Sequence, residues 1–334
     1  MELNEKQLIG HDEQRAQLRQ LLREGRLPHA LLFSGPDGIG KKMLGQMLAA
    51  AILCGAEEAP CGHCESCRAM RLDSHPDYYE VLPESRGKSA KIIRIEQIRE
   101  MQTIASRYPV LSDCRVVLID EAECMNEAAA NSLLKTLEEP EGQVTFILIT
   151  SARSSLLDTI ISRCMPMAFG MLPLDGMKEA LIGRQIPDHE AAELAALADG
   201  SLGRAIRLYE NGGLMLRDDA LTFLEKLSAM TMEDVWVQAK TKGELDREKL
   251  MEWFLYLNML LRDMLVLYED GASQLLYHQD CRQRLAALLS EVPERQIFAM
   301  LTQVRETQRR LQANVNLRLQ LEGFFIRILD CRKA

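Results

Sequence analysis

A glycine-rich segment near the N-terminus contains the residues needed to bind a phosphate group. It reads Gly35-Pro36-Asp37-Gly38-Ile39-Gly40-Lys41-Lys42 and lies between an apolar run and a helical pattern. Glycines let successive backbone N–H groups converge on phosphate oxygens, the start of a helix adds its dipole, and the lysine reaches the β- and γ-phosphates. We interpret it as a phosphate-binding loop whose ligand-contacting residues are Gly35, Gly38, Gly40 and Lys41. The alternative is a turn that has kept this shape and binds nothing.

The last residue of this loop departs from the usual pattern. A serine or threonine hydroxyl normally follows the lysine and binds Mg²⁺, but this chain has Lys42. An ammonium group accepts no hydrogen bond and brings positive charge to the place of the cation. We therefore expect nucleotide hydrolysis to suffer more than nucleotide binding. Lys42 could also supply some of the metal's charge, so it is kept among the ligand-binding candidates.

Two carboxylates follow an apolar strand pattern further along the chain. Asp120 and Glu121 come directly after Val116-Val117-Leu118-Ile119. This is the arrangement of a phosphoryl-transfer site in which the aspartate holds magnesium and the glutamate orients a water. Acidic residues also commonly follow buried strands without any such role. The phosphate-binding loop upstream favours the functional interpretation of the pair.

Four of the nine cysteines crowd into fourteen residues, at Cys54, Cys61, Cys64 and Cys67. Pro60 and Gly62 indicate a looped knuckle, and four thiolates at this spacing predict a structural zinc ion; an iron–sulfur cluster or free, redox-active thiols are the alternatives. Four sulfur ligands leave no coordination position for a catalytic water. His63 and His75 could replace a cysteine, but we expect them to be solvated or hydrogen-bonded. The other cysteines are expected to be small buried side chains.

An arginine follows the fourth predicted strand, in Ser162-Arg163-Cys164. The planar guanidinium stays protonated and binds oxygens in pairs, so Arg163 could stabilise phosphoryl charge in a neighbouring subunit. Taken on its own, the residue is more simply interpreted as one partner of an internal salt bridge. An oligomeric context would favour the first role.

The elements that position these residues follow from hydrophobic periodicity. Short apolar runs alternate with amphipathic helical patterns, which predicts an α/β domain with a parallel sheet covered on both faces, over about residues 1–168. The expected strands are Ala30–Phe33, Tyr79–Leu82, Val116–Ile119, Thr145–Ile149 and Met165–Phe169. The expected helices are Lys41–Leu53, Ile95–Ser106 and Glu127–Leu137, with a short one at Ser155–Ile161.

The rest of the chain has helical patterns only. Residues 169–210 are rich in Ala and Leu and predict a small helical lid, with Glu190–Ala198 ended by Asp199-Gly200. Residues 211–334 predict a third, all-helical domain, with apolar spacing in Met251–Leu265, Cys281–Leu289 and Ile297–Leu329.

Composition narrows the class of protein. The chain has 334 residues, 47% hydrophobic and 27% charged, and no apolar run long enough for a membrane span. The first residues, MELNEKQLIGHDEQ, do not resemble an export signal, so we expect a cytoplasmic protein. A net charge of −9 gives no global positive field, so any nucleic-acid contact is expected to be local or shared with partners.

The motifs occur together in an order that resembles one family. The loop Gly35–Lys42, the cysteine knuckle, Ser74-His75-Pro76-Asp77-Tyr78-Tyr79, Leu133-Leu134-Lys135-Thr136-Leu137-Glu138-Glu139-Pro140 and Ser162-Arg163-Cys164 are similar to the clamp-loader subunits of bacterial DNA polymerase III. The resemblance covers about residues 5–210. Further on, Asn314-Val315-Asn316-Leu317-Arg318-Leu319 to Glu322 is similar to the family's final helix.

The resemblance implies a fold and a set of partners. It implies an AAA+ RecA-like sheet domain with the zinc knuckle at 54–67, a helical lid and a C-terminal helical collar that assembles a hetero-pentamer with gamma or tau and delta subunits. The assembly would act on a sliding clamp and primed DNA. ATP would lie between subunits, Arg163 would serve the neighbour's site in trans, and Thr150 would be a polar sensor residue.

Two departures set this chain apart from the family's motor subunits. Lys42 replaces the magnesium-binding hydroxyl, and Gly203 lies where the resemblance places a lid arginine that contacts the γ-phosphate, Arg204 being one position later. The leading hypothesis is therefore a stator that lends Arg163 to its neighbour and has no polymerase or ATPase activity of its own, although ATP or ADP could bind. The alternative is a motor subunit with its own ATPase activity. A zinc-dependent enzyme is disfavoured by the four sulfur ligands.

Overall fold

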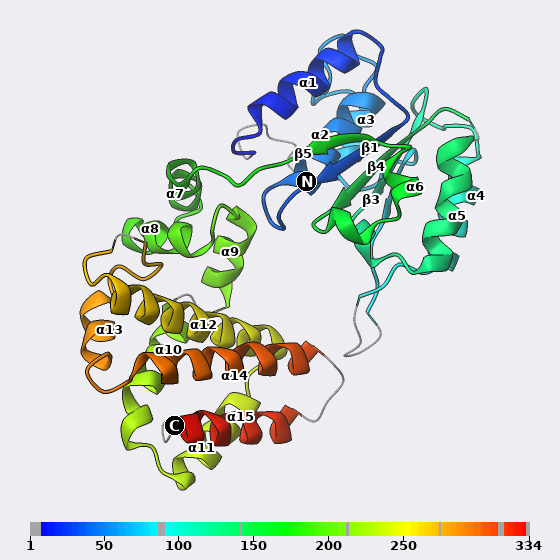
Figure 1. Ribbon diagram of the computed structural model, residues 1–334. Coiled ribbons are helices and arrows are strands. Elements are labelled where there is room, and N and C mark those ends of the chain that lie inside the picture. The colour runs from blue at the N-terminus through cyan, green and yellow to red at the C-terminus, as the bar shows by residue number, and fades with distance from the viewer. Residues whose placement is uncertain are drawn as a thin grey trace. The chain divides into compact units, whose positions relative to one another are not determined.

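The fold is taken from a computed structural model, which describes residues 8–85, 91–140, 142–211, 214–273, 275–312 and 317–331. The chain packs as two compact units (Figure 1). The first comprises Met1–Arg184 with Asp199–Arg204, and the second comprises Gln185–Ala198 with Ala205–Ala334. Among the described residues, no helix is both long and apolar enough to cross a membrane.

The first unit is built around five parallel strands. They are β1 (Ala30–Ser34), β2 (Tyr78–Val81), β3 (Arg115–Ile119), β4 (Val144–Thr150) and β5 (Met165–Ala168), in the order β2-β3-β4-β1-β5. Every residue of β1 and β3 is buried, as expected for strands covered on both faces. Because the strands are parallel, the residues that follow them emerge at one edge of the sheet.

Each face of the sheet has its own hydrophobic core. Leu31 and Phe33 of β1 belong to one core and Leu32 to the other, since successive side chains of a strand point to opposite faces. The helices on the first face are α1 (Asp12–Arg23), α2 (Lys41–Leu53) and α3 (Glu65–Arg71). Those on the second are α4 (Ile95–Ala105), α5 (Glu127–Glu138) and α6 (Asp158–Ile161).

This architecture confirms the predicted fold class, an α/β sheet domain with a helical C-terminal part. All five strands lie within one or two residues of their predicted bounds, and α2 has the predicted bounds. Two short 3₁₀ segments, η2 (Ala122–Cys124) and η3 (Arg153–Ser155), lie beside the sheet. Of the patterned stretch Ser155–Ile161, Ser155 ends η3 and only Asp158–Ile161 is α-helical, with Leu157 in extended conformation before the helix.

The residues predicted to form a lid, 169–210, contribute to both units. Helix α7 (Leu174–Ile182) lies in the first unit and α8 (Asp188–Leu197) in the second. Asp199 and Gly200, the predicted stop, both have positive φ, 48° and 76°, which ends α8. Helix α9 (Leu202–Glu210) begins in the first unit and continues in the second. The predicted division at 168 and 210 remains a prediction.

The second unit is helical throughout its described residues. Besides α8 and most of α9 it contains α10 (Leu214–Lys226), η4 (Leu227–Ala229), α11 (Met232–Gly243), α12 (Arg247–Glu269), α13 (Arg282–Leu288), α14 (Glu294–Gln312) and α15 (Leu317–Cys331). Aromatic side chains fill its core around Trp253. The pattern predicted from Ile297 to Leu329 is divided between α14 and α15; Asn314 to Asn316 of the family motif lie outside the described residues.

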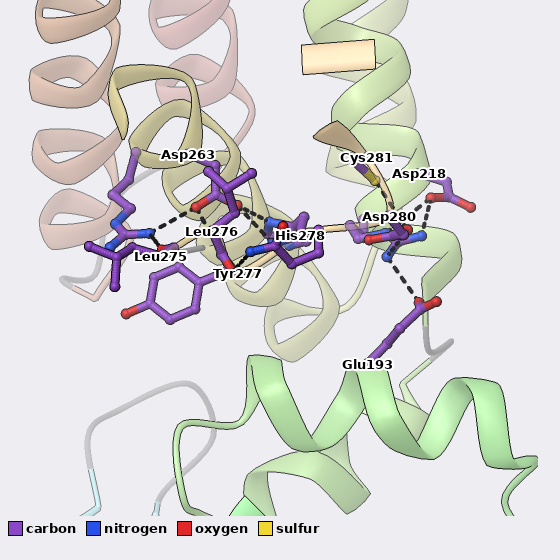
Figure 2. A network of polar contacts seen from close by, with 12 residues as sticks. Glu193, Asp218, Asp263, Leu275, Leu276, Tyr277, His278, Asp280 and Cys281 are labelled. Carbon is purple, nitrogen blue, oxygen red and sulfur yellow. Dashed lines mark hydrogen bonds and ion pairs between the residues drawn. The ribbon is translucent and has the colours of Figure 1, made fainter. Parts of the chain in front are cut away.

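A buried carboxylate anchors the segment before α13 to α12 (Figure 2). Asp263, fully buried, accepts hydrogen bonds from the backbone N–H groups of Tyr277 at 3.0 Å and His278 at 2.9 Å. The His278 ring is 2.8 Å from the same carboxylate. Burial would raise the pKa of Asp263, but these hydrogen bonds outweigh it and hold the pKa below its usual range. The charged carboxylate therefore stabilises a segment that has no regular structure of its own.

Candidate functional site

The glycine-rich loop that the sequence predicts to bind phosphate lies between β1 and α2. Gly38 and Gly40 have φ values of +74° and +101°, in the left-handed region that side chains disfavour. Gly40 is the residue that precedes the first turn of α2, and Lys41 is the first residue of the helix. The glycines in the sequence are thus needed for the path of the chain whether or not a ligand is bound.

Lys41 is turned back onto the loop that carries it. Its Nζ donates to the carbonyl oxygens of Gly35 at 2.7 Å and Pro36 at 2.5 Å, and only 6% of the residue is exposed. Burial lowers the pKa of Lys41, although the carboxylates of Asp37, Glu123 and Asp120 act in the opposite direction. The ammonium group that would reach a phosphate is therefore already satisfied by two carbonyl groups.

The segment Asp199–Arg204 packs directly on this loop. The Gly203 N–H donates to the Gly38 carbonyl at 2.7 Å, and the Ser201 hydroxyl donates to the Asp37 carbonyl at 2.7 Å. A Cβ atom at Gly203 would lie 2.8 Å from the Gly38 Cα, closer than real Cβ contacts allow. Any side chain at position 203 would force the segment away from the loop.

Lys42 lies between two carboxylates. Its Nζ is 3.2 Å from Glu80 Oε2 and 3.4 Å from Asp120 Oδ2. The other oxygen of Glu80 accepts hydrogen bonds from Gln46 at 2.6 Å and Tyr78 at 2.5 Å. Burial would raise the pKa of Glu80, but these hydrogen bonds and the charge of Lys42 outweigh it and lower the pKa. The chain itself thus places one positive charge between the two carboxylates of this site.

The two carboxylates that follow Asp120 in the sequence, Glu121 and Glu123, have different partners. Glu121 has a left-handed backbone, φ 47°, and its carboxylate pairs with Lys91 at 2.7 Å. Glu123, which the sequence analysis did not single out, accepts from the Ser151 N–H at 2.9 Å. Burial would raise the pKa of Glu123, but Ser151 and Thr150 donate to it and lower the pKa. Glu123 is therefore the carboxylate whose charge acts on Lys41 together with Asp37 and Asp120.

Thr150, the predicted sensor, is fully buried at the end of β4. Its hydroxyl accepts from the Ala152 N–H at 3.1 Å. It is paired in the sheet with Ser34, the residue before the phosphate-binding loop. Thr150 thus lies beside the start of the loop, and its hydroxyl already accepts a hydrogen bond within the chain.

Arg163 is held by an ion pair inside the chain. Its guanidinium bonds the carboxylate of Glu138, at the end of α5, and donates to the Thr159 carbonyl at 2.8 Å. The pair is partly exposed, with 32% of the Arg163 side chain and 48% of the Glu138 side chain accessible. Exposed pairs of this kind contribute about 0–1 kcal/mol, so a stronger anionic partner can displace Glu138.

The four predicted cysteine ligands converge between the end of α2 and the first turn of α3. Their sulfur atoms all lie within 4.8 Å of one another, with Cys54 and Cys64 at 3.8 Å and Cys61 and Cys67 at 4.0 Å. Zn–S bonds of about 2.3 Å in a tetrahedron place sulfur atoms about 3.8 Å apart, so the cluster fits zinc. The N–H groups of His63 and Cys64 lower the pKa of Cys61 to about 6, which favours the metal-binding thiolate.

The two histidines near the cluster are not among its ligands. The His63 ring is bonded to the Cys61 carbonyl at 2.8 Å on the surface. His75 is buried and bonded to Ser66 at 2.8 Å. When zinc is bound, it supplies four strong bonds that tie the residues around α3 together and no open position for chemistry.

Comparison with known proteins identifies the family of both units. The family model described as "DNA polymerase III, delta subunit" matches residues 10–173. The model described as "DNA polymerase III, delta subunit, C terminal" matches residues 218–329. Together they cover the sheet domain and most of the helical domain.

Curated relatives match over nearly the whole chain. DNA polymerase III subunit delta' of Pseudomonas aeruginosa is 32% identical over 325 residues, which are 94% of this chain and 95% of the relative. Subunit delta' of Bacillus subtilis is 30% identical over 92% of this chain and 93% of the relative. Subunit tau of Salmonella typhimurium is also 32% identical, but over 68% of this chain and 36% of tau.

Proposed function

Because this chain belongs to the DNA polymerase III subunit delta' family, we propose that it acts in a clamp loader as a stator that hydrolyses no ATP. In this proposal it binds gamma or tau and delta subunits in a hetero-pentamer and supplies Arg163 to the ATPase site of a neighbour. Through the assembly it contributes to loading a sliding clamp on primed DNA. Zinc in the cysteine cluster has a structural role.

The position of Lys42 is the main support for the proposal that this chain does not hydrolyse ATP. Phosphoryl transfer by a loop of this kind uses a divalent cation held by a hydroxyl and an aspartate. Here the hydroxyl is missing, and the Lys42 ammonium lies 3.4 Å from the aspartate, Asp120. A divalent cation at this carboxylate would be repelled by Lys42 and would have to displace it.

The covered loop adds to this argument. Lys41 donates to Gly35 and Pro36, and Gly203 packs on Gly38, so a phosphate would have to break several internal hydrogen bonds before it could bind. Gly203 explains why a lid arginine cannot be accommodated in this arrangement. If the chain were instead a motor subunit that hydrolyses ATP, the contacts of Lys41 and Gly203 with the loop would have to rearrange.

Arg163 suits a role in trans for a different reason. It is a permanently charged donor of paired hydrogen bonds, and its partner Glu138 is an exposed carboxylate that holds it weakly. Phosphoryl oxygens of a nucleotide in an adjoining subunit carry more negative charge than one carboxylate. In the assembly the guanidinium would exchange Glu138 for those oxygens.

A divalent-cation binding experiment tests the role of Lys42. In the variant Lys42→Thr the ammonium is replaced by a hydroxyl, which leaves Glu80 and Asp120 free to bind a cation. We expect Mn²⁺, followed by its EPR signal, to bind the variant at least about ten-fold more tightly than the unchanged chain, a gain of about 1.4 kcal/mol. Lys91→Thr, which removes the same charge from the pair with Glu121, is the matched control. Equal Mn²⁺ binding by Lys42→Thr and the unchanged chain would refute the role given to Lys42.

A further inference from the structure

The loop between α4 and β3 exposes two large side chains although its backbone is firmly held. Tyr108 is 94% exposed and Val110 is 75% exposed. Beneath them, the buried Asp77 carboxylate accepts from the N–H groups of Val110 at 2.7 Å, Leu111 at 2.7 Å and Ser112 at 2.9 Å. The residues Arg107–Ser112, the braced loop, are therefore fixed in shape by a residue from a distant part of the sequence.

A buried arginine completes this support. Arg115 donates to the carbonyls of Arg107 at 3.1 Å and Tyr108 at 2.8 Å, and lies 3.5 Å from Asp77. Burial would raise the pKa of Asp77, but the three N–H donors and Arg115 outweigh it and lower the pKa. The Asp77 carboxylate is thus charged, and its oxygens are engaged by the three N–H groups and Arg115. A buried polar network whose members all have partners holds the groups around it in one conformation.

His75 connects this support to the cysteine knuckle. Its Nδ1 accepts from the Asp77 N–H at 3.0 Å, so the proton of the neutral ring lies on Nε2. Nε2 is 2.8 Å from Ser66 Oγ and 3.4 Å from Ser112 Oγ, and both hydroxyls donate to the Leu53 carbonyl. Because Nε2 is a donor, the grouping of Ser66, His75 and Asp77 cannot work as a hydrolytic triad. It works as a link.

The link begins inside the metal site. Ser66 lies between Cys64 and Cys67 in the first turn of α3, and the Cys64 sulfur accepts from the Cys67 N–H at 3.3 Å. The Ser66 hydroxyl donates to the carbonyl of Leu53, the residue before Cys54. Whatever holds the four sulfur atoms together therefore also fixes the position of the Ser66 hydroxyl.

We propose that zinc binding to Cys54, Cys61, Cys64 and Cys67 holds the braced loop in its conformation through Ser66, His75 and Asp77. Metal binding and folding are coupled in small metal-bound segments, so α3 loosens when the metal leaves. The His75 imidazole then loses the Ser66 hydroxyl, and Asp77 loses the ring that positions its backbone. This inference concerns the first unit alone; it rests on the proposed zinc site and not on the ATPase proposal.

Hydrogen–deuterium exchange of the full chain tests the coupling. On removal of zinc with a chelator, exchange of the peptide containing Val110, Leu111 and Ser112 should rise at least about ten-fold, while peptides of α12 in the second unit stay unchanged. Unchanged exchange in the braced loop, with zinc loss shown by metal analysis, would overturn the proposal.

A variant that keeps all four cysteines covers the case in which zinc removal unfolds the whole first unit. Ser66→Ala should keep its zinc and still raise exchange of the braced loop about three-fold or more. Ser74→Ala is the matched control, because the exposed Ser74 hydroxyl bonds the Ala69 carbonyl at 3.4 Å and no other group among the described residues. If zinc-loaded Ser66→Ala protects the loop as well as Ser74→Ala does, the link does not exist.

Discussion

Replacing Arg163 with alanine should lower ATP turnover at the neighbouring subunit's site by roughly 10³-fold, the effect of removing an arginine finger. The reason is the loss of a positive charge that stabilises the developing charge on the transferred phosphoryl group. The measurement is steady-state ATP hydrolysis by an assembled ring in which the other ATPase sites are disabled by changes in the motor subunits. Folding of this chain should be preserved, because the ion pair with Glu138 is partly exposed.

The matched control is Arg153→Ala, which removes an exposed arginine from the nearby segment η3. That change should leave turnover within about two-fold of the unchanged ring, since exposed charges away from the site have small effects. Full turnover at the single active site with Arg163→Ala, in rings shown to contain the variant, would rule out the finger.

The second large effect concerns the metal cluster. Cys64→Ser should abolish stoichiometric zinc binding, because Cys64 both contributes a sulfur ligand and accepts the N–H of Cys67 at the start of α3. Zinc supplies about 10 kcal/mol or more to the folding of zinc-finger peptides. Losing even a third of that would lower the melting temperature of a unit of this size by roughly 6–13 °C. Metal analysis and thermal unfolding followed by circular dichroism measure both effects.

Cys114→Ser provides the comparison for this experiment. Cys114 is also a half-buried cysteine of the first unit, but it lies outside the cluster. Its change should leave the zinc content intact and lower the melting temperature far less. Equal zinc content and equal melting temperature in Cys64→Ser and Cys114→Ser would show that the cluster is not a structural metal site.

The strands of the sheet and the loop at its edge could be predicted, because hydrophobic periodicity and glycine turns depend on residues that are close together in the sequence. Strands such as β3 contain continuous apolar runs, here Val116–Ile119, and Gly38 and Gly40 mark a turn that few other residues can form. The departure at Lys42 could be recognised for the same reason, because the phosphate-binding pattern normally has a serine or threonine at this position. The convergence of the cysteines likewise followed from their spacing.

The partners of these residues could not be predicted, because they depend on how strands and loops are placed in three dimensions. Glu80 reaches Lys42 only because β2 pairs with β3 at the edge of the sheet. Glu121 has a left-handed backbone conformation that the sequence pattern did not predict. Glu123, rather than Glu121, is the carboxylate whose charge acts on Lys41. The approach of Gly203 to Gly38 joins positions 165 residues apart.

Steady-state hydrolysis of Mg-ATP by the purified chain alone is the most direct test of the idea that this subunit assists a reaction that it does not perform. With Lys42 paired to Asp120 and Lys41 bonded to its own loop, we expect phosphate release no faster than the background without protein. Sustained turnover on the order of 1 s⁻¹ or faster, within the usual range of enzymes, would contradict the account and support the motor alternative.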